Sequence, residues 1–298
     1  MRKYRLKGHG GFFMREGWFA KGMTEVLENP RLFTKENYSG ADALGVGSAM
    51  AKAIRYWMGV CGLIKEVRGT GTVLTEMGQL IAGEDLYLED LFSVWLLHIH
   101  AVSSAEKATI WYLFFETMPL GEFTREQMQE KLYEELLRYS GENEVSERSF
   151  TDDCNTFLQM YVDSKEEKED PEDKKRSVFA RLRLIQKNYR GYRRERIVPE
   201  RLPKEIVLLV LRRKILGKQG ESIENLLTCE NGPGKLLSLD RILFNEYLDE
   251  LENDGCLRIN RTAGLDMVYL SEEVPEELEI IQQYYEKRQE QSTRGRTV

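Results

Sequence analysis

Residues 44–47, Leu-Gly-Val-Gly, constrain the fold of this chain more than any other stretch. Glycine adopts positive φ without a steric penalty, so two glycines this close favour a tight turn between helices. The segment that follows has apolar residues at helical spacing. These are Met50, Ile54, Trp57, Met58 and Cys61. The pattern predicts a helix that begins at residue 48 and packs this face into a core.

The opposite face of the predicted helix is polar and basic, with Ser48, Lys52, Arg55 and Tyr56. Such a face is chemically suited to a DNA groove. Beyond the helix the sequence turns at residues 68–71, Arg-Gly-Thr-Gly, which predicts a two-stranded hairpin. Together these elements predict a winged helix-turn-helix that contacts DNA through Ser48, Lys52, Arg55 and Arg68. Many winged helices bind only protein, and a helical pair with a hairpin and no nucleic acid is the other alternative.

The composition of the 298-residue chain is that of a soluble globular protein, with 41% hydrophobic and 31% charged residues. Glu, Lys, Leu and Arg are abundant and Pro is scarce, so helix should dominate. We expect a mainly α fold, with tandem winged helix-turn-helix units and small β-hairpin wings. A net charge of −7 argues against a surface that coats nucleic acid everywhere, but it allows a local basic site.

Signals for membranes and secretion are not recognised. No run approaches the roughly 18 apolar residues of a membrane span, and the basic start has no apolar run behind it, unlike a signal peptide. The four cysteines form no CxxC pair. We therefore expect a cytoplasmic protein with free thiols and no membrane partner.

Five segments are expected along the chain. An N-terminal helical module with the winged helix-turn-helix spans residues 1–120, and a second helical unit, a candidate helix-turn-helix, spans 121–162. A charged connector follows over 163–201, then a C-terminal winged-helix-like domain over 202–275. The last segment, 276–298, is a tail that begins as a helix and whose end, from residue 292, should be disordered.

The second helical unit and the C-terminal domain carry further markers. Thr124 and Gln127 match a capping box, which predicts a helix from there through Arg138. In the C-terminal domain the order helix, helix, helix, hairpin recurs, but its third helix, over 239–253, is rich in Asp and Glu. Phosphates would repel such a helix. We expect it to bind protein or to stabilise the fold.

The charge changes sign within the predicted connector. Residues 163–173 are mainly acidic, whereas 174–214 are mainly basic. The densest basic run interleaves arginines with tyrosines, which suits phosphate contact and stacking. We take Lys187, Arg190, Arg193 and Arg194 as candidate DNA contacts. The alternative is a solvated connector whose acidic and basic arms neutralise each other.

No catalytic constellation is recognisable. The sequence has no Walker loop, no nucleophile elbow and no dinucleotide-binding motif. The histidines are His9, His98 and His100. Positions two apart point to different sides of a helix, so His98 and His100 should be core residues rather than joint metal ligands. We predict a protein that is not an enzyme and has no metal or other cofactor.

Several motifs together resemble a known family. They include Gly8-His9, Arg15, Gly17-Trp18, the run from Leu44 to Trp57, Leu74-Thr75, Gly83-Glu84-Asp85, the run from Trp95 to His100, Gly232-Pro233-Gly234 and Thr262-Ala263-Gly264-Leu265. This pattern resembles a bacterial family of unknown function, numbered four-thousand-and-seven, over nearly the whole chain. One departure concerns His9: glycines follow it where the family has Glu and Thr, which removes a hydrogen-bond partner expected for the imidazole.

The resemblance implies a setting rather than a reaction. Members of the family lie in bacterial defence islands beside phosphoadenosine-phosphosulfate-reductase-like proteins, in DNA phosphorothioation or related anti-phage systems. Our leading hypothesis is a non-enzymatic, DNA-binding accessory or regulatory protein of such a system. The alternative is an adaptor that docks the sulfotransfer-type partner, or another defence protein, without contacting DNA.

Overall fold

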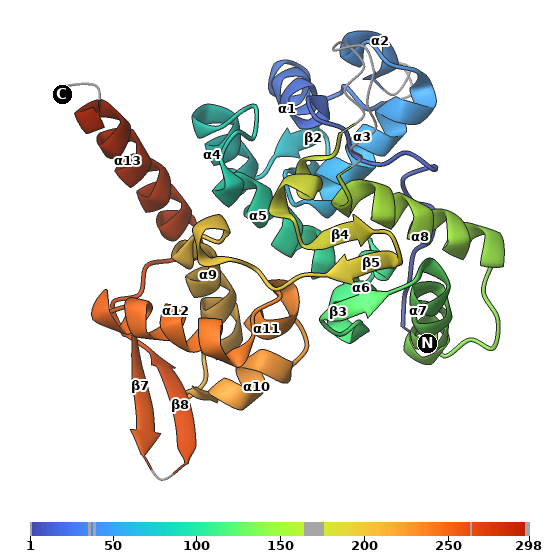
Figure 1. Cartoon of the computed structure of the whole chain (residues 1–298). Coiled ribbons are helices and arrows are strands. Elements are labelled where there is room, and N and C mark those ends of the chain that lie inside the picture. The colour runs from blue at the N-terminus through green and yellow to red at the C-terminus, as the bar shows by residue number, and fades with distance from the viewer. Residues whose placement is uncertain (1, 35–36, 38–39, 164–175, 263, 296–298) are drawn as a thin grey trace. The chain divides into compact units, whose positions relative to one another are not determined.

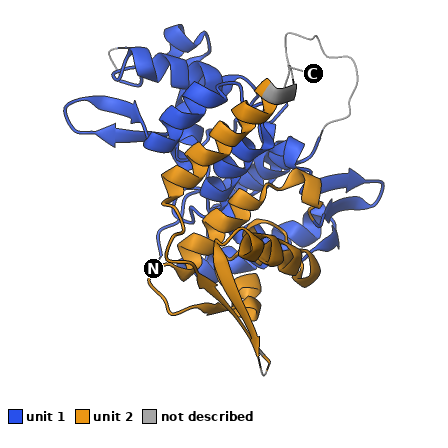
Figure 2. Ribbon diagram, turned by 90° about the vertical axis from the view of Figure 1, so that its left-hand side faces the viewer, with its two compact units in different colours: residues 1–196 blue, residues 197–298 orange. Residues whose placement is uncertain are grey.

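The computed structural model describes residues 2–34, 37, 40–163, 176–262 and 264–295. The chain divides into two compact units, Met1–Arg196 and Ile197–Val298 (Figures 1 and 2). Both contain helices and small antiparallel sheets. The expectation of a helix-rich chain with small β-hairpins is therefore confirmed, and the overall class is mixed α/β. Within the described residues, no helix is long and apolar enough to cross a membrane.

The first unit begins with the predicted turn, helix and hairpin. Its elements are α1 (Trp18–Glu28), α2 (Ala41–Leu44), α3 (Ser48–Val60), β1 (Ile64–Val67), β2 (Gly71–Leu74) and α4 (Glu76–Glu84). Gly45 ends α2 with a φ of 63°, as the turn requires. The same expectation was wrong for Gly47, which has a φ of −64° and an extended backbone as it leads into α3.

The core of the first unit is aromatic. It is built on α5 (Leu91–Val102) and α6 (Thr109–Thr117), which are almost fully buried, as their apolar sequences predicted. Phe114 and Phe157 pack with ring centroids 4.4 Å apart, and His98 lies among four aromatic rings. The His98 Nδ1 atom is 2.8 Å from the Tyr161 hydroxyl. His98 is therefore a hydrogen-bonded core residue, as expected.

The remaining elements of the first unit close around this core. They are β3 (Gly121–Phe123), α7 (Arg125–Ser140), α8 (Glu147–Tyr161), the 3₁₀ helix η2 (Val178–Leu182), β4 (Ile185–Asn188) and β5 (Gly191–Arg194). The predicted capping box is confirmed, because Thr124 and Gln127 cap α7 reciprocally.

Part of the predicted connector is folded into the first unit. The antiparallel sheet has the order β3-β5-β4, with Lys187 opposite Tyr192 and Phe123 opposite Tyr192. This part of the connector folds onto the first unit because its apolar side chains are buried. Leu182, Leu184 and Ile185 are buried, and the Tyr192 ring stacks on Phe123. Most of the acidic run, from residue 164 onward, lies outside the described residues.

The second unit has a helical body and a three-stranded sheet. Its elements are η3 (Pro199–Arg201), α9 (Lys204–Ile215), β6 (Glu221–Ser222), α10 (Ile223–Thr228), α11 (Pro233–Leu236), α12 (Arg241–Asn253), β7 (Leu257–Thr262), β8 (Leu265–Leu270) and α13 (Glu277–Gly295). Strand β6 pairs with β8, which pairs with β7 in an antiparallel hairpin. The expected disorder from residue 292 was wrong as far as Gly295, because α13 extends to that residue.

Trp57 tests how far α3 depends on its buried face. Its indole is fully buried, so Trp57→Ala should lower the free energy of unfolding by about 3–5 kcal/mol, because apolar burial is removed and a cavity remains. Urea denaturation provides the measurement. Leu27→Ala on α1 is the control, since Leu27 is 59% exposed and should change stability by no more than about 0.5 kcal/mol. Equal effects of the two variants would contradict the inward packing of Trp57.

Candidate nucleic-acid interface

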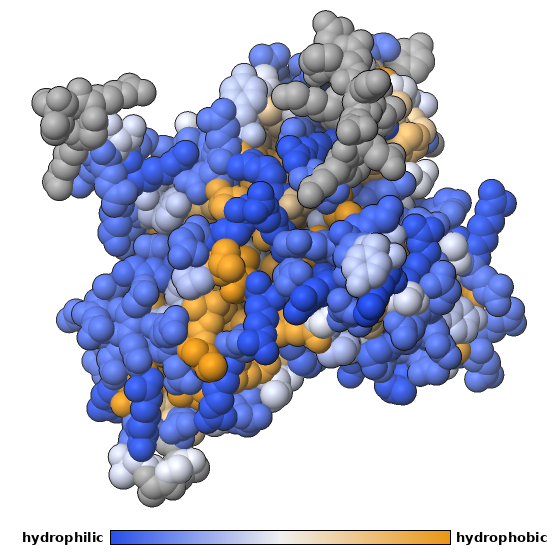
Figure 3. Space-filling view, viewed as in Figure 1, coloured by the Kyte–Doolittle hydropathy of each residue, from blue (hydrophilic) through white to orange (hydrophobic). Residues whose placement is uncertain are grey.

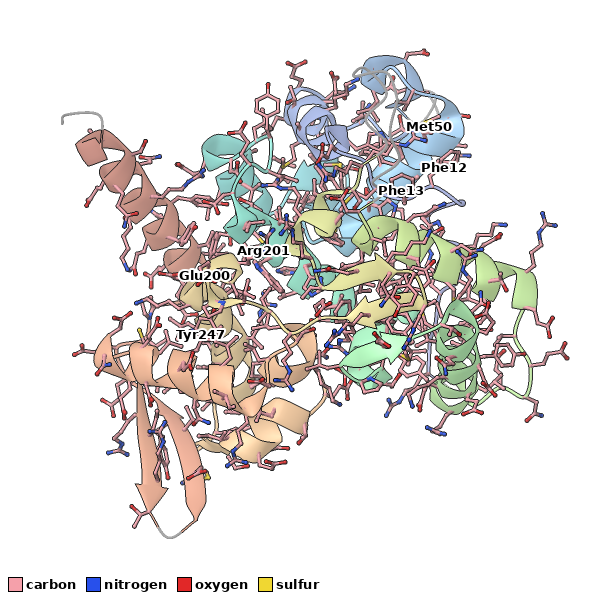
Figure 4. All side chains as sticks on the ribbon, in the orientation of Figure 1. Phe12, Phe13, Met50, Glu200, Arg201 and Tyr247 are labelled. Atoms are coloured by element: carbon pink, nitrogen blue, oxygen red, sulfur yellow. The ribbon has the colours of Figure 1, made fainter. Side chains whose placement is uncertain are left out.

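Helix α3 presents most of its predicted polar face to solvent. Tyr56 is the exception, because it is half-buried and its hydroxyl donates to the carbonyl of Lys107 over 2.6 Å. Ser48, Lys52 and Arg55 are exposed, whereas Ile54 and Trp57 on the inner face are fully buried. Met50, labelled in Figure 4, is the exception to the predicted apolar stripe, because it is only half-buried. The helix packs against α1 and against β1. Burial of one face therefore fixes which side chains α3 can offer to a ligand.

The hairpin β1–β2 is tied to the outer face of α3 through one carboxylate. The Arg55 Nη2 atom donates to Glu66 Oε1 over 2.8 Å, and the Thr72 hydroxyl donates to the same oxygen over 2.8 Å. Partial burial raises the pKa of Glu66, but the hydrogen bonds from Arg55 and Thr72 outweigh it, and the net pKa is lowered. Arg55 thus uses one of its five donors on the hairpin. Arg68 lies exposed at the hairpin turn.

An anchor from the start of the chain holds α3 in place. The backbone N–H of Gly11 donates to His9 Nδ1 over 3.0 Å, so the His9 Nε2–H donates to Asp153 Oδ1, 2.9 Å away on α8. The His9 ring stacks on Trp57 at 5.6 Å with an interplanar angle of 11°. The Trp57 Nε1–H donates to the carbonyl of Phe12 over 2.9 Å.

Sequence reasoning did not find Asp153, and no local signal reveals it. Asp153 lies 144 positions from His9, and only the fold brings them together. Asp153 is the hydrogen-bond partner of His9, in place of the Glu that follows this histidine in the family motif. The close passage also explains Gly8, because a Cβ there would lie 2.3 Å from the Tyr56 ring.

The second predicted basic set lies on the hairpin β4–β5. Lys187, Arg190 and Arg193 are exposed. The Arg190 guanidinium lies 5.1 Å from the centre of the Tyr189 ring, and Tyr189 at the turn is 88% exposed. A stacked guanidinium and phenol on a protruding turn suit a phosphate and an unpaired base.

Arg194 does not belong to this surface. It is buried, and its Nη1 atom donates to the carbonyls of Phe115 and Met118 at the end of α6. Burial lowers the pKa of Arg194 to about 10, and the group therefore stays charged at neutral pH. It satisfies carbonyls that a helix leaves unpaired at its C-terminal end. The candidate DNA contact at Arg194 is corrected to a structural role.

The two basic sets do not form one surface. Hairpins β1–β2 and β4–β5 project from opposite sides of the first unit, shown in blue in Figure 2. Ser48, Lys52, Arg55 and Arg68 are carried by α3 and the first hairpin. Lys187, Arg190 and Arg193 are carried by the second.

Chemistry elsewhere in the described residues is limited. No three His, Cys, Asp or Glu side chains come together there in a group that could hold a metal ion. Cys61 and Cys154 are buried free thiols, and burial raises the pKa of both. They behave as small hydrophobic residues rather than as nucleophiles.

The comparisons with known proteins establish the family. The model of a family described as "Protein of unknown function (DUF4007)" matches residues 6–285. The chain belongs to this family. The resemblance found in the motifs is thereby confirmed. No curated protein matches the chain.

Two solved structures share the fold. A magnesium ion-bound crystal structure of SspB matches with a TM-score of 0.79 and 22% identity, over 95% of this chain and 87% of SspB. A second SspB crystal structure matches with a TM-score of 0.76 and 21% identity, over 97% of this chain and 96% of that one. The match extends over both units. At these identities the likeness concerns the fold alone.

Arg194 and its neighbour Arg193 form a matched pair for testing the correction. Arg194→Leu should lower the free energy of unfolding by roughly 2–4 kcal/mol, because two buried carbonyls lose their donor. Removal of the buried charge offsets only part of this cost. Arg193→Leu, at an exposed position, should change it by less than about 0.5 kcal/mol. Urea denaturation of both variants decides the point. A stable Arg194→Leu protein that binds DNA more weakly than its parent would contradict the correction and indicate that Arg194 contacts DNA.

Proposed function

We propose that this protein is a DNA-binding accessory or regulatory component of a bacterial DNA-modification defence system of the phosphorothioation type, without catalysis of its own. The observation that carries the proposal is the outer face of α3. Lys52 and Arg55 are exposed there, beside a hairpin with Arg68 at its turn. The inner face of the same helix is buried in the core. We place it in the cytoplasm, where its thiols stay reduced.

The finer fold proposal is that both units contain winged helices. In the first unit, α1, α2, α3 and the hairpin β1–β2 follow in the required order. In the second, β6 pairs with the last strand of the β7–β8 hairpin, and α12 precedes that hairpin. In this proposal α3 lies in the major groove, where Ser48, Lys52 and Arg55 reach base edges or phosphates, and Arg68 contacts the backbone beside it.

The α3 face is tested by removing its charges together. Lys52→Ala with Arg55→Ala should weaken binding to a fluorescent duplex by about 1–3 kcal/mol for each base-specific interaction that is removed. Anisotropy titrations over a salt series provide the measurement, and phosphate neutralisation by Lys52, Arg55 and Arg68 predicts a slope of about −3 in log K against log salt.

Two further proteins make this result interpretable. Lys131→Ala with Arg138→Ala on α7 removes the same charge from another helix of the first unit and should bind as the parent does. Because Arg55→Ala leaves the Glu66 carboxylate facing the DNA, a variant that adds Glu66→Gln separates the removed attraction from new repulsion. Parental affinity in a folded Lys52→Ala, Arg55→Ala protein would remove α3 from the interface.

The hairpin β4–β5 is proposed as a second, independent site that binds the nucleic-acid backbone. Replacing Lys187, Arg190 and Arg193 by Gln should weaken binding about equally for all DNA sequences and flatten the salt slope by about one unit for each phosphate no longer neutralised. Because the two hairpins face opposite ways, the reductions in binding free energy from the two sets should add. If this triple variant matches its parent in affinity and slope, the hairpin is solvated surface.

The absence of catalysis is tested in the same titrations. SspB, which shares the fold, has been crystallised with a magnesium ion, so the assays are run with Mg²⁺ and with a chelator, and the DNA is then resolved under denaturing conditions. We expect intact strands in both. Strand cleavage that requires both the protein and Mg²⁺ would overturn the non-enzymatic part of the proposal.

An adaptor role is the second candidate function. It is favoured by α12, where Glu246, Asp249 and Glu250 are exposed and would repel phosphates. In this role the protein docks a phosphoadenosine-phosphosulfate-reductase-like or other defence protein without touching DNA. Reversing Asp249 and Glu250 to Lys should then abolish association with the partner. No DNA binding at low salt by the parent protein would favour this candidate over the first.

A further inference from the structure

The second unit contains a shallow cavity of about 130 Å³ between η3 and α12. It is lined by Pro199, Leu202, Lys204, Leu243, Glu246, Tyr247 and Glu250. The Tyr247 hydroxyl donates to the carbonyl of Leu202 over 2.7 Å and lies 3.2 Å from that of Pro199. Tyr247 therefore holds the η3 segment against α12, so the wall of the cavity is preformed. Figure 4 labels Glu200, Arg201 and Tyr247 in this region.

The charge at this cavity is negative. Burial raises the pKa of the Tyr247 hydroxyl, and the carboxylates of Glu250, Glu200 and Glu246 raise it further, which places all three near the same phenol. Glu246 and Glu250 are one turn apart on the exposed face of α12. The basic residue of the lining, Lys204, is compensated by Asp254, 2.6 Å away.

Two exposed apolar residues lie next to elements that line the cavity. Ile242 is 72% exposed and stands one turn before Glu246 on α12, and Val198, next to Pro199, is 47% exposed. In Figure 3, hydrophobic surface gathers over α9 and α12 between hydrophilic residues. An exposed isoleucine and valine beside a preformed cavity are typical of a protein-binding surface.

From this arrangement we propose that the cavity receives an arginine or lysine side chain of a partner protein, with an adjacent apolar side chain of the partner on Ile242. Pro199, Leu202 and Leu243 would contact the aliphatic stem, while Glu246 and Glu250 would bind the charged head. The occupant is a basic, apolar segment of protein. Nucleic acid does not fit, because its phosphates meet carboxylates. The inference deepens the adaptor candidate, on whose α12 face it rests, and it does not depend on DNA binding by the first unit.

The test uses the full-length protein and a synthetic probe. The probe is a fluorescein-labelled peptide, Gly-Ser-Leu-Arg-Leu-Arg-Gly-Ser, and the control peptide has Glu in place of both Arg residues. Fluorescence anisotropy should show saturable binding of the arginine peptide that weakens with salt, and no binding of the glutamate peptide. Equal binding of both peptides, or no saturable binding of the arginine peptide up to about 1 mM, would overturn the proposal.

Matched variants locate the site. Glu246→Gln with Glu250→Gln should weaken peptide binding at least about tenfold, because the cationic head of the peptide loses two anionic acceptors and keeps only neutral amide oxygens. Glu272→Gln with Glu273→Gln makes the same charge change at exposed positions after β8 and should have no effect. Ile242→Ser should weaken binding several-fold while leaving the melting temperature unchanged. Parental peptide affinity in the folded Glu246→Gln, Glu250→Gln protein would also overturn the proposal. The same variants are titrated with DNA, so that failure of the peptide site is distinguished from failure of the DNA-binding function.

Discussion

The first unit depends on a buried contact between the start of the chain and two helices far along it. His9 joins Asp153 on α8 and stacks on Trp57 of α3, while Phe12 accepts the indole hydrogen bond of Trp57. Without His9 the buried Asp153 carboxylate would keep only the backbone N–H of Lys7 as a donor, and a poorly satisfied buried charge costs more than the absence of an ordinary surface hydrogen bond. The anchor therefore fixes the rotation of α3, and with it which residues face solvent.

Once α3 is fixed, internal pairing decides which charges reach a ligand. Arg194 donates to a carbonyl at the end of α6, and Arg55 donates to the Glu66 carboxylate. Counting arginines along the chain therefore overstates the positive surface. Lys52, Arg68 and the tip of the β4–β5 hairpin remain outward, which is a modest basic surface on an acidic protein.

Local patterns predicted local structure well. The apolar spacing around Trp57 defined α3 and its buried face, Thr124 and Gln127 marked the start of α7, and the acidic helix α12 was placed within two residues of its bounds. Failures came where tertiary contacts decide. The arginine at 194 differs from that at 193 only in strand face: one side of β5 packs inward and the other does not. No composition argument separates neighbours that alternate in this way.

The second unit shows why the two proposed surfaces need different ligands. Its arginines beside α12 are compensated within the chain, because Arg241 bridges Glu224 and Asp266 and Arg261 pairs with Asp249. The carboxylates at 246 and 250, near the cavity, outnumber the single compensated lysine of its lining. A polyanion would thus be repelled at α12, while a cationic side chain would be attracted there. Because many charges pair within the chain, a basic surface at α3 and an acidic surface at α12 both arise in a protein of ordinary composition.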